Sequence, residues 1–253
     1  MPQHPRRRDV VLSRYLRVRL RSDKRTVLSP LSASQVFLVM LSNFVTYILQ
    51  GTAITVAVTL VALPAGLVVG LLMALVHTYG GKVANRLAAA YSLLLRGVPP
   101  IVLLFIIYFI LSGDLLNLNE FWAGSLSLGI VSSAYQMEIL RGALLSVGGG
   151  QMTAARAIGM SRLQAIQHIL LPQALRLAIP PWSNEASIVL KDSSLVYALG
   201  VPEILRRAQQ LSATTQQPFL AYGTAALIYF VLVFAVNRGL DYLSERTKLP
   251  THS

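Results

Sequence analysis

Residues 148–176 read GGGQMTAARAIGMSRLQAIQHILLPQALR and separate two long apolar segments of the chain. This stretch, named here the 148–176 loop, is polar and basic. We expect a first short helix over residues 152–158, ended by Gly159, which can adopt the left-handed conformation common after helices. Such an element between membrane segments is either an ordinary connection or a docking element for a soluble partner.

A second short helix is predicted to follow Gly159. Ser161 and Gln164 have the spacing of a capping box. Apolar residues then recur with the helical period, at Leu163, Ile166, Ile169 and Leu170. Because proline disrupts the interior of a helix, we expect the second helix to end near Pro172.

The composition predicts an integral membrane protein built of α-helices. Of the 253 residues, 54% are hydrophobic and 13% are charged, whereas soluble domains carry about 25% charged residues. The mean hydropathy is +0.59. Several apolar runs approach the roughly 20 residues that span a bilayer.

The net charge of +12 raises the question of a nucleic-acid partner. The basic residues lie in the N-terminal arm and the polar loops, where membrane orientation explains them. No basic face interleaved with aromatic residues accompanies them, so nucleic-acid binding is not predicted. The absence of cysteine excludes disulfides and thiolate metal sites, and the four scattered histidines form no metal-ligating pattern.

The order of polar and apolar stretches suggests four parts. They are a basic arm over 1–30, an amphipathic or membrane-associated helix over 31–50, a transmembrane domain over 51–245 with the 148–176 loop, and a tail over 246–253. The predicted spans are 52–78, 87–111, 122–147, 175–199 and 220–236. Residues 96–100 (RGVPP) interrupt the second span, and 201–219 are expected to be a polar connection.

The side of the membrane follows from charge. The loop near 79–96, the 148–176 loop and the tail are rich in Lys and Arg, which places them in the cytoplasm. With five spans the basic arm lies outside the cell, and if residues 34–49 form a sixth span the arm lies inside. The polar residues of 34–50 recur on one side of a helix, which favours a helix in the membrane interface.

Two helix-surface patterns predict packing. Gly66 and Gly70 form a small-xxx-small pair that allows close approach of another helix, from this chain or from another subunit. Glu138 and Arg141 are three residues apart, which favours a local ion pair.

No catalytic grouping is visible. The chain has no GxxxxGK[ST] loop to cradle phosphate, no nucleophile–histidine–acid arrangement and no H-x-x-x-H pair. We therefore expect no catalytic residues, no metal site and no enzyme activity. Any energy from ATP must come from a separate subunit.

Polar and ionisable residues inside the fourth span suggest a solute site, because such groups are costly in a membrane. Asn184, Ser187 and Lys191 share one helical face, and Glu185 and Asp192 share an adjacent one. A cavity with both charges suits a zwitterionic solute, with Lys191 for a carboxylate and Glu185 or Asp192 for an amine or guanidinium. The alternative is that these groups pair with one another as structural contacts.

The 148–176 loop resembles the cytoplasmic loop of ABC importer permeases, which has the form EAA, then a glycine, then I-x-L-P. Four further stretches are similar to the subgroup that imports polar amino acids: QGTAITVAVTL at 50–60, RGVPPIVLLFIIYF at 96–109, AYQMEILRGALLSV at 134–147 and PPWSNEASIVLKDSSLVYALGVPEIL at 180–205. The resemblance covers roughly residues 48–245.

This resemblance implies a type I ABC importer permease core of five transmembrane helices, multi-pass in the inner membrane, contacting lipid. The implied partners are a second permease subunit, an ABC ATPase dimer that carries ATP and Mg, an extracytoplasmic binding protein and an amino-acid substrate; no cofactor is implied on this chain. The family's ATPase-docking positions correspond to Thr153, Ala154, Ala155, Gly159, Leu163 and Pro172, with Thr153 replacing the usual glutamate. The family's internal substrate site corresponds to Asn184, Glu185, Lys191 and Asp192.

The leading hypothesis is therefore the permease subunit of an ATP-driven importer. The alternative is an ATP-independent carrier or channel for a small charged solute. Carriers of that kind often contain internal repeats, and none is convincing here.

Overall fold

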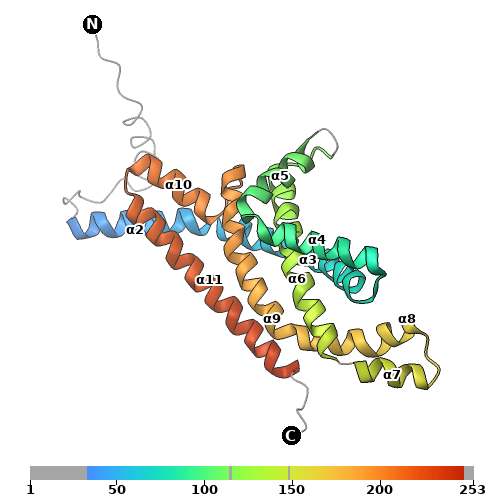
Figure 1. Cartoon of the computed structure of the whole chain (residues 1–253). Helices are drawn as coiled ribbons and strands as arrows, with labels where there is room; N and C mark the ends of the chain where they lie inside the picture. The colour runs from blue at the N-terminus through green and yellow to red at the C-terminus, as the bar shows by residue number, and fades with distance from the viewer. Residues whose placement is uncertain (1–32, 114–115, 148, 248–253) are drawn as a thin grey trace. The chain divides into compact units, whose positions relative to one another are not determined.

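The computed structural model describes residues 33–113, 116–147 and 149–247, and in these ranges every regular element is a helix (Figure 1). The chain divides into two units, residues 1–43 and 44–253. The predicted basic arm over 1–30 lies outside the described residues. Helix α2 (Ala33–Leu49) begins in the first unit and ends in the second.

The second unit holds the remaining helices. They are α3 (Thr52–Tyr79), α4 (Lys82–Gly97), α5 (Pro100–Ser112), α6 (Glu120–Ser146), α7 (Gly149–Ala157), α8 (Arg162–Ala165), α9 (Leu171–Asp192), α10 (Ile204–Thr215) and α11 (Pro218–Thr247). A π-helical turn, η1 (Ile166–Leu170), and a 3₁₀ helix, η2 (Ser193–Leu199), complete them. The predicted spans over 52–78, 122–147 and 220–236 correspond to the long helices α3, α6 and α11.

Helices α3 and α6 pack closely through glycine. A Cβ atom on Gly66 would lie 2.8 Å from the carbonyl oxygen of Gly129, and one on Gly70 would lie 2.8 Å from that of Ser133. The small-xxx-small pair therefore packs against a helix of the same chain, which answers the question left open by the sequence. Buried apolar residues of α3, α6 and α9 form the adjoining core.

The predicted interruption of the second span at residues 96–100 is confirmed, because the helix breaks there. Helices α4 and α5 are separate, and the chain bends by 113° at the break between them. Val98 and Pro99 between them have extended backbones, with ψ of 140° and 132°. Each precedes a proline, whose ring disfavours the helical conformation in the residue before it.

The predicted helix end near Pro172 was wrong. Helical turns run from α8 through η1 into α9 without a break. The amide of Leu171 donates to the carbonyl of Ile166, five residues back. Pro172 directly follows this π-helical turn, so its missing N–H falls where the regular i→i−4 bonding is already interrupted.

The polar connection predicted over 201–219 contains a helix, α10, which the sequence analysis did not predict. The Glu203 carboxylate caps this helix by accepting from the amides of Leu205 (2.8 Å) and Arg206 (2.6 Å). Its side chain also accepts from the hydroxyl of Tyr229 on α11, at 2.6 Å. This buried contact joins α10 to α11.

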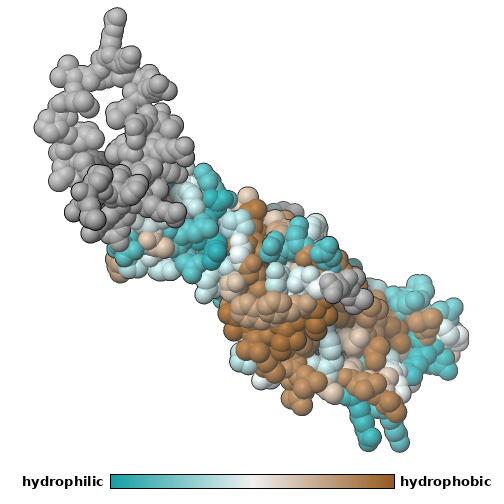
Figure 2. Space-filling model, turned by 90° about the horizontal axis from the view of Figure 1, so that it is seen from above, coloured by the Kyte–Doolittle hydropathy of each residue, from teal (hydrophilic) through white to brown (hydrophobic). Residues whose placement is uncertain are grey.

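Within the part of the chain that the structure describes, length and hydropathy mark two helical stretches as able to cross a membrane alone, Leu41–Tyr79 and Pro218–Tyr242. The bent pair α4–α5 passes the same test only when taken together. One face of the second unit shows a broad hydrophobic surface (Figure 2). Large apolar side chains are exposed on α4, α5 and α11, among them Leu93, Phe109 and Phe230, as expected for helices that contact lipid or another subunit.

Candidate substrate pocket and coupling loop

The 148–176 loop folds around a small core, to which Tyr79 at the end of α3 and Val147 also contribute. Ala155, Ala165 and Leu170 are buried there, and Met152, Met160 and Ile169 pack against them. The first helix starts at Gly149, earlier than the expected residue 152. The predicted turn is confirmed, because Gly159 has φ +88°, in the left-handed region that favours glycine.

The predicted capping box is confirmed in both directions. The amide of Gln164 donates to the hydroxyl of Ser161 at 3.2 Å, and the amide of Ser161 donates to the Gln164 side chain at 2.8 Å. These two bonds satisfy amides that would otherwise lack partners at the helix start. The second half of the turn is therefore held by contacts within four residues.

The tip of the loop exposes apolar side chains. Ile158 is 77% exposed and Leu163 is 63% exposed, on either side of Gly159. An open groove is lined by Ile158, Gly159, Met160, Gln164 and His168. The tip therefore has a surface that a protein partner could cover.

The six predicted coupling residues divide by exposure. Thr153, Ala154, Gly159, Leu163 and Pro172 are exposed. Ala155 is buried (1% exposed) and belongs to the loop's core. Ala155 therefore supports the turn and offers no surface to a partner.

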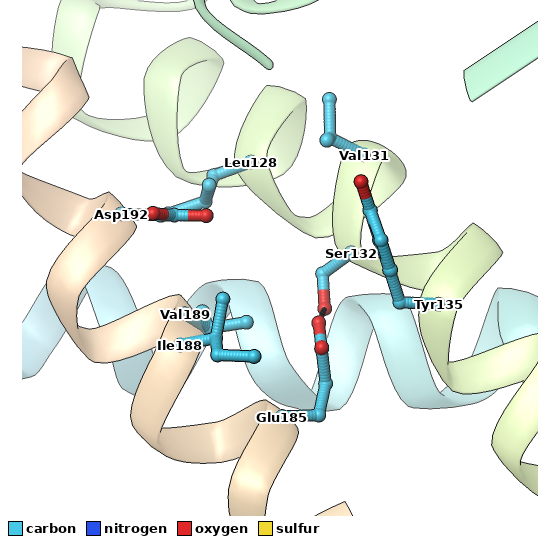
Figure 3. Close-up of a pocket in the computed structure, with 8 residues that line it drawn as sticks. All are labelled: Leu128, Val131, Ser132, Tyr135, Glu185, Ile188, Val189 and Asp192. Atoms are coloured by element: carbon cyan, nitrogen blue, oxygen red, sulfur yellow. Dashed lines mark hydrogen bonds between the residues drawn. The ribbon is translucent and has the colours of Figure 1, made fainter. Parts of the chain in front are cut away.

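A cavity of about 110 Å³ lies between α6 and α9 (Figure 3). Its lining residues are Leu128, Val131, Ser132, Tyr135, Glu185, Ile188, Val189 and Asp192. Of the five predicted substrate residues, Glu185 and Asp192 line it. The Ser132 hydroxyl donates to Glu185 Oε1 at 2.7 Å, and the Glu185 side chain is 4% exposed.

The other three predicted substrate residues do not line this cavity. Asn184 and Lys191 are exposed on α9. Ser187 is buried, and its hydroxyl donates to Asn237 of α11 and to the carbonyl of Ser183. The three residues that share this helical face therefore have different surroundings. Ser187 packs against α11, whereas Asn184 and Lys191 lie on an open surface.

Sequence reasoning missed the contribution of α6. Ser132 and Tyr135 line the cavity together with Glu185 and Asp192. Their polarity does not single them out, because the same helix also carries Ser125, Ser127, Ser133 and Gln136. Their proximity to α9 depends on helix packing, which a single sequence does not show.

The predicted ion pair near the end of α6 is confirmed and is part of a larger cluster. Glu138 lies 3.4 Å from Arg141 and 3.7 Å from Arg96 of α4. The Ser92 hydroxyl also donates to Glu138 at 2.7 Å. The cluster therefore links α4 to α6.

Known proteins match most of the chain. The family model of the binding-protein-dependent transport system inner membrane component matches residues 66–249. The octopine transport system permease protein of Rhizobium radiobacter is 37% identical over 198 residues, which are 74% of this chain and 84% of that protein. The glutamine transport system permease protein of Escherichia coli (strain K12) is 34% identical over 204 residues, 80% of this chain and 93% of that protein.

A solved structure described as an amino acid ABC transporter with histidines has the same fold. Its TM-score is 0.73 at 31% sequence identity, and the match covers 82% of this chain and 97% of that one. The predicted type I ABC importer permease fold is thereby confirmed. The chain belongs to the family of binding-protein-dependent transport system inner membrane components, as a permease component of ABC amino-acid import.

Proposed function

We propose that this chain forms half of the translocation path for a polar amino acid. In this proposal it pairs with a second permease subunit, identical or homologous, and receives substrate from an extracytoplasmic binding protein. A separate ATPase dimer, which holds ATP and Mg, docks on the 148–176 loop. The 148–176 loop and the C-terminus lie in the cytoplasm, as their basic charge favours.

The observation that carries this proposal is the uninterrupted run of helical turns α8–η1–α9. It begins beside the exposed tip at Gly159 and ends at Asp192, which lines the cavity. Movement of a docked partner against the tip would therefore be transmitted along one helical segment to the cavity. A connecting loop without a docking role would not need an exposed apolar tip on a preformed core.

The lining of the cavity indicates which part of the substrate it would hold. Glu185 and Asp192 carry oxygens that accept hydrogen bonds, which suits an amine or a guanidinium. Lys191, exposed on the neighbouring face of α9, is the proposed partner of the substrate carboxylate, with Asn184 beside it. Ser187 is engaged by Asn237, so we assign it to helix packing within the site.

The docking proposal is tested by Gly159→Asp. An aspartate is strained at φ +88° and places a charge at the apolar tip. We expect normal membrane insertion but loss of the ATPase from the purified complex, with the ATPase identified as a Walker-motif protein encoded next to this chain. Gly81→Asp is the matched control, because Gly81 has φ −70° and open space around it.

Retention of the ATPase and full uptake of labelled amino acid by the Gly159→Asp variant would overturn the docking role. Uptake that continues without any ATPase would favour the ATP-independent carrier instead. Equal loss in both variants would show that added charge, and not the turn, is responsible.

A further inference from the structure

A chain of hydrogen bonds crosses twice between α9 and α6 and ends in the cavity. The indole Nε1 of Trp182 donates to Gln136 Oε1 at 2.8 Å. Gln136 Nε2 donates to Ser132 Oγ at 3.1 Å, and Ser132 Oγ donates to Glu185 Oε1 at 2.7 Å. The last of these contacts is visible in Figure 3.

The direction of this chain is determined by its first member. An indole N–H can only donate, so the Gln136 atom that faces Trp182 must be the carbonyl oxygen. The amide nitrogen of Gln136 therefore faces Ser132 and donates to it. Since Ser132 then accepts from Gln136, its single hydroxyl hydrogen is available for the Glu185 carboxylate.

Gln136 is fully buried and its amide is fully used. Its exposed fraction is 0%. Besides the bonds to Trp182 and Ser132, Nε2 donates to the carbonyl of Leu63 on α3 at 3.3 Å. The missing side chain of Gly66 provides the room, since a Cβ there would lie 2.6 Å from this nitrogen. The amide has no alternative orientation that keeps these contacts.

We propose that Gln136, oriented by Trp182, is a positioning residue that directs the Ser132 hydroxyl onto Glu185 and so holds the Glu185 carboxylate ready for a donor group of the substrate. The inference rests on the proposed function, because it assigns the cavity to substrate. Gln136 does not touch the substrate and acts through Ser132. The substrate group it serves is an ammonium or a guanidinium, since a carboxylate accepts hydrogen bonds.

The test is a double-mutant cycle on the purified permease–ATPase complex without its binding protein. Equilibrium binding of radiolabelled arginine, glutamine and histidine is measured for wild type, Ser132→Ala, Gln136→Leu and the double variant. Ser146→Ala is the matched control, because Ser146 is on the same helix and donates only to its own helix, at Gly142.

Each single variant is expected to weaken binding about tenfold, as for loss of a hydrogen bond to a charged group. The double variant should be no weaker than either single one, because both break the same chain. Ser146→Ala should bind as wild type does. The ATPase should stay bound in all four variants, and basal ATPase activity should be unchanged in the control Ser146→Ala.

Additive losses in the double variant, or unchanged affinity in Gln136→Leu, would overturn the positioning role. If Gln136→Leu does not assemble, Trp182→Phe replaces it in the cycle, since it removes the donor and keeps a ring. We expect Trp182→Phe to lose less affinity than Gln136→Leu, again without additivity with Ser132→Ala. Additive losses would overturn the positioning role here too. If the wild-type complex binds none of the three amino acids, the proposed substrate site fails, and this inference fails with it.

Discussion

The two ends of the helical run α8–η1–α9 are built in opposite ways. The end at Gly159 is exposed and held by contacts within a few residues, such as the Ser161–Gln164 capping box. The end at Glu185 and Asp192 is packed against α6 and held by partners far away in the chain, since Ser132 and Glu185 are 53 positions apart.

This difference separates the consequences of substitution in the two regions. Changes at the exposed end should alter what the protein binds in solution and leave the membrane fold intact. Changes at the packed end should alter the stability of the fold or the binding of the solute. Five substitutions test the separation.

The largest effect is expected where α3 and α6 meet, at Gly66 beside Gln136. In Gly66→Val the new Cβ would lie 2.6 Å from Gln136 Nε2 and 2.8 Å from the carbonyl of Gly129. Overpacking of this kind costs about 3 kcal/mol, so we expect loss of monodisperse protein in detergent, measured by size-exclusion chromatography. Gly142→Val on α6 is the control, because Gly142 has open space around it. Equal yields would show that α3 and α6 can separate at no cost.

The next effect concerns the cavity itself. Asp192→Asn removes a charge that faces the cavity and keeps the shape of the side chain. The amino-acid concentration that gives half-maximal uptake should therefore rise about tenfold. The ATPase should remain bound, since the loop tip is untouched. Asp241→Asn, on the exposed part of α11, is the control. Unchanged half-saturation would remove Asp192 from the proposed site.

At the exposed end, Ser161→Ala removes the cap of α8. Loss of such a cap costs about 1 kcal/mol, and we expect that cost to stay within the loop. Hydrogen exchange at residues 162–165 should accelerate, while the thermal unfolding midpoint of the whole protein stays the same. A lower global midpoint would contradict the local character of this end.

The smallest effect is expected at the ion-pair cluster of Glu138, Arg141 and Arg96. In Arg141→Gln the Glu138 carboxylate keeps Arg96 and Ser92. Partly exposed pairs contribute less than about 1 kcal/mol, so thermal stability should hardly change. Arg96→Gln should cost more, because Arg96 also lies 5.7 Å over the ring of Tyr135, which lines the cavity. The reverse order would show that Arg141 is the main partner of Glu138.

The features that sequence predicted best are those made by neighbouring residues. The turn at Gly159 and the capping box of Ser161 depend on backbone preferences and on bonds within four residues. The ion pair of Glu138 and Arg141 has the same local origin. The long apolar helices α3 and α11 were also visible, because the composition of a span must match the bilayer.

The features that sequence missed depend on what surrounds a residue. Pro172 was expected to end a helix, but a π-helical turn before it allows the backbone to continue. The residues of 201–219 looked like a polar connection, but Glu203 caps a helix there and accepts from Tyr229. Proline and polar residues disrupt or stabilise a helix according to the backbone geometry and the partners around them, which the residue type alone does not show.

By itself, the sequence determined that this protein is helical, lies in a membrane and has a helix–glycine–helix loop, because hydropathy, periodicity and capping act over short distances. Tertiary structure alone decided which polar residues meet. It brought Glu185 and Asp192 to one cavity with Ser132, left Lys191 and Asn184 outside it, and connected Trp182 to Glu185 through α6. A hydrogen bond needs two groups within about 3 Å, and only the packing of α3, α6 and α9 provides that proximity.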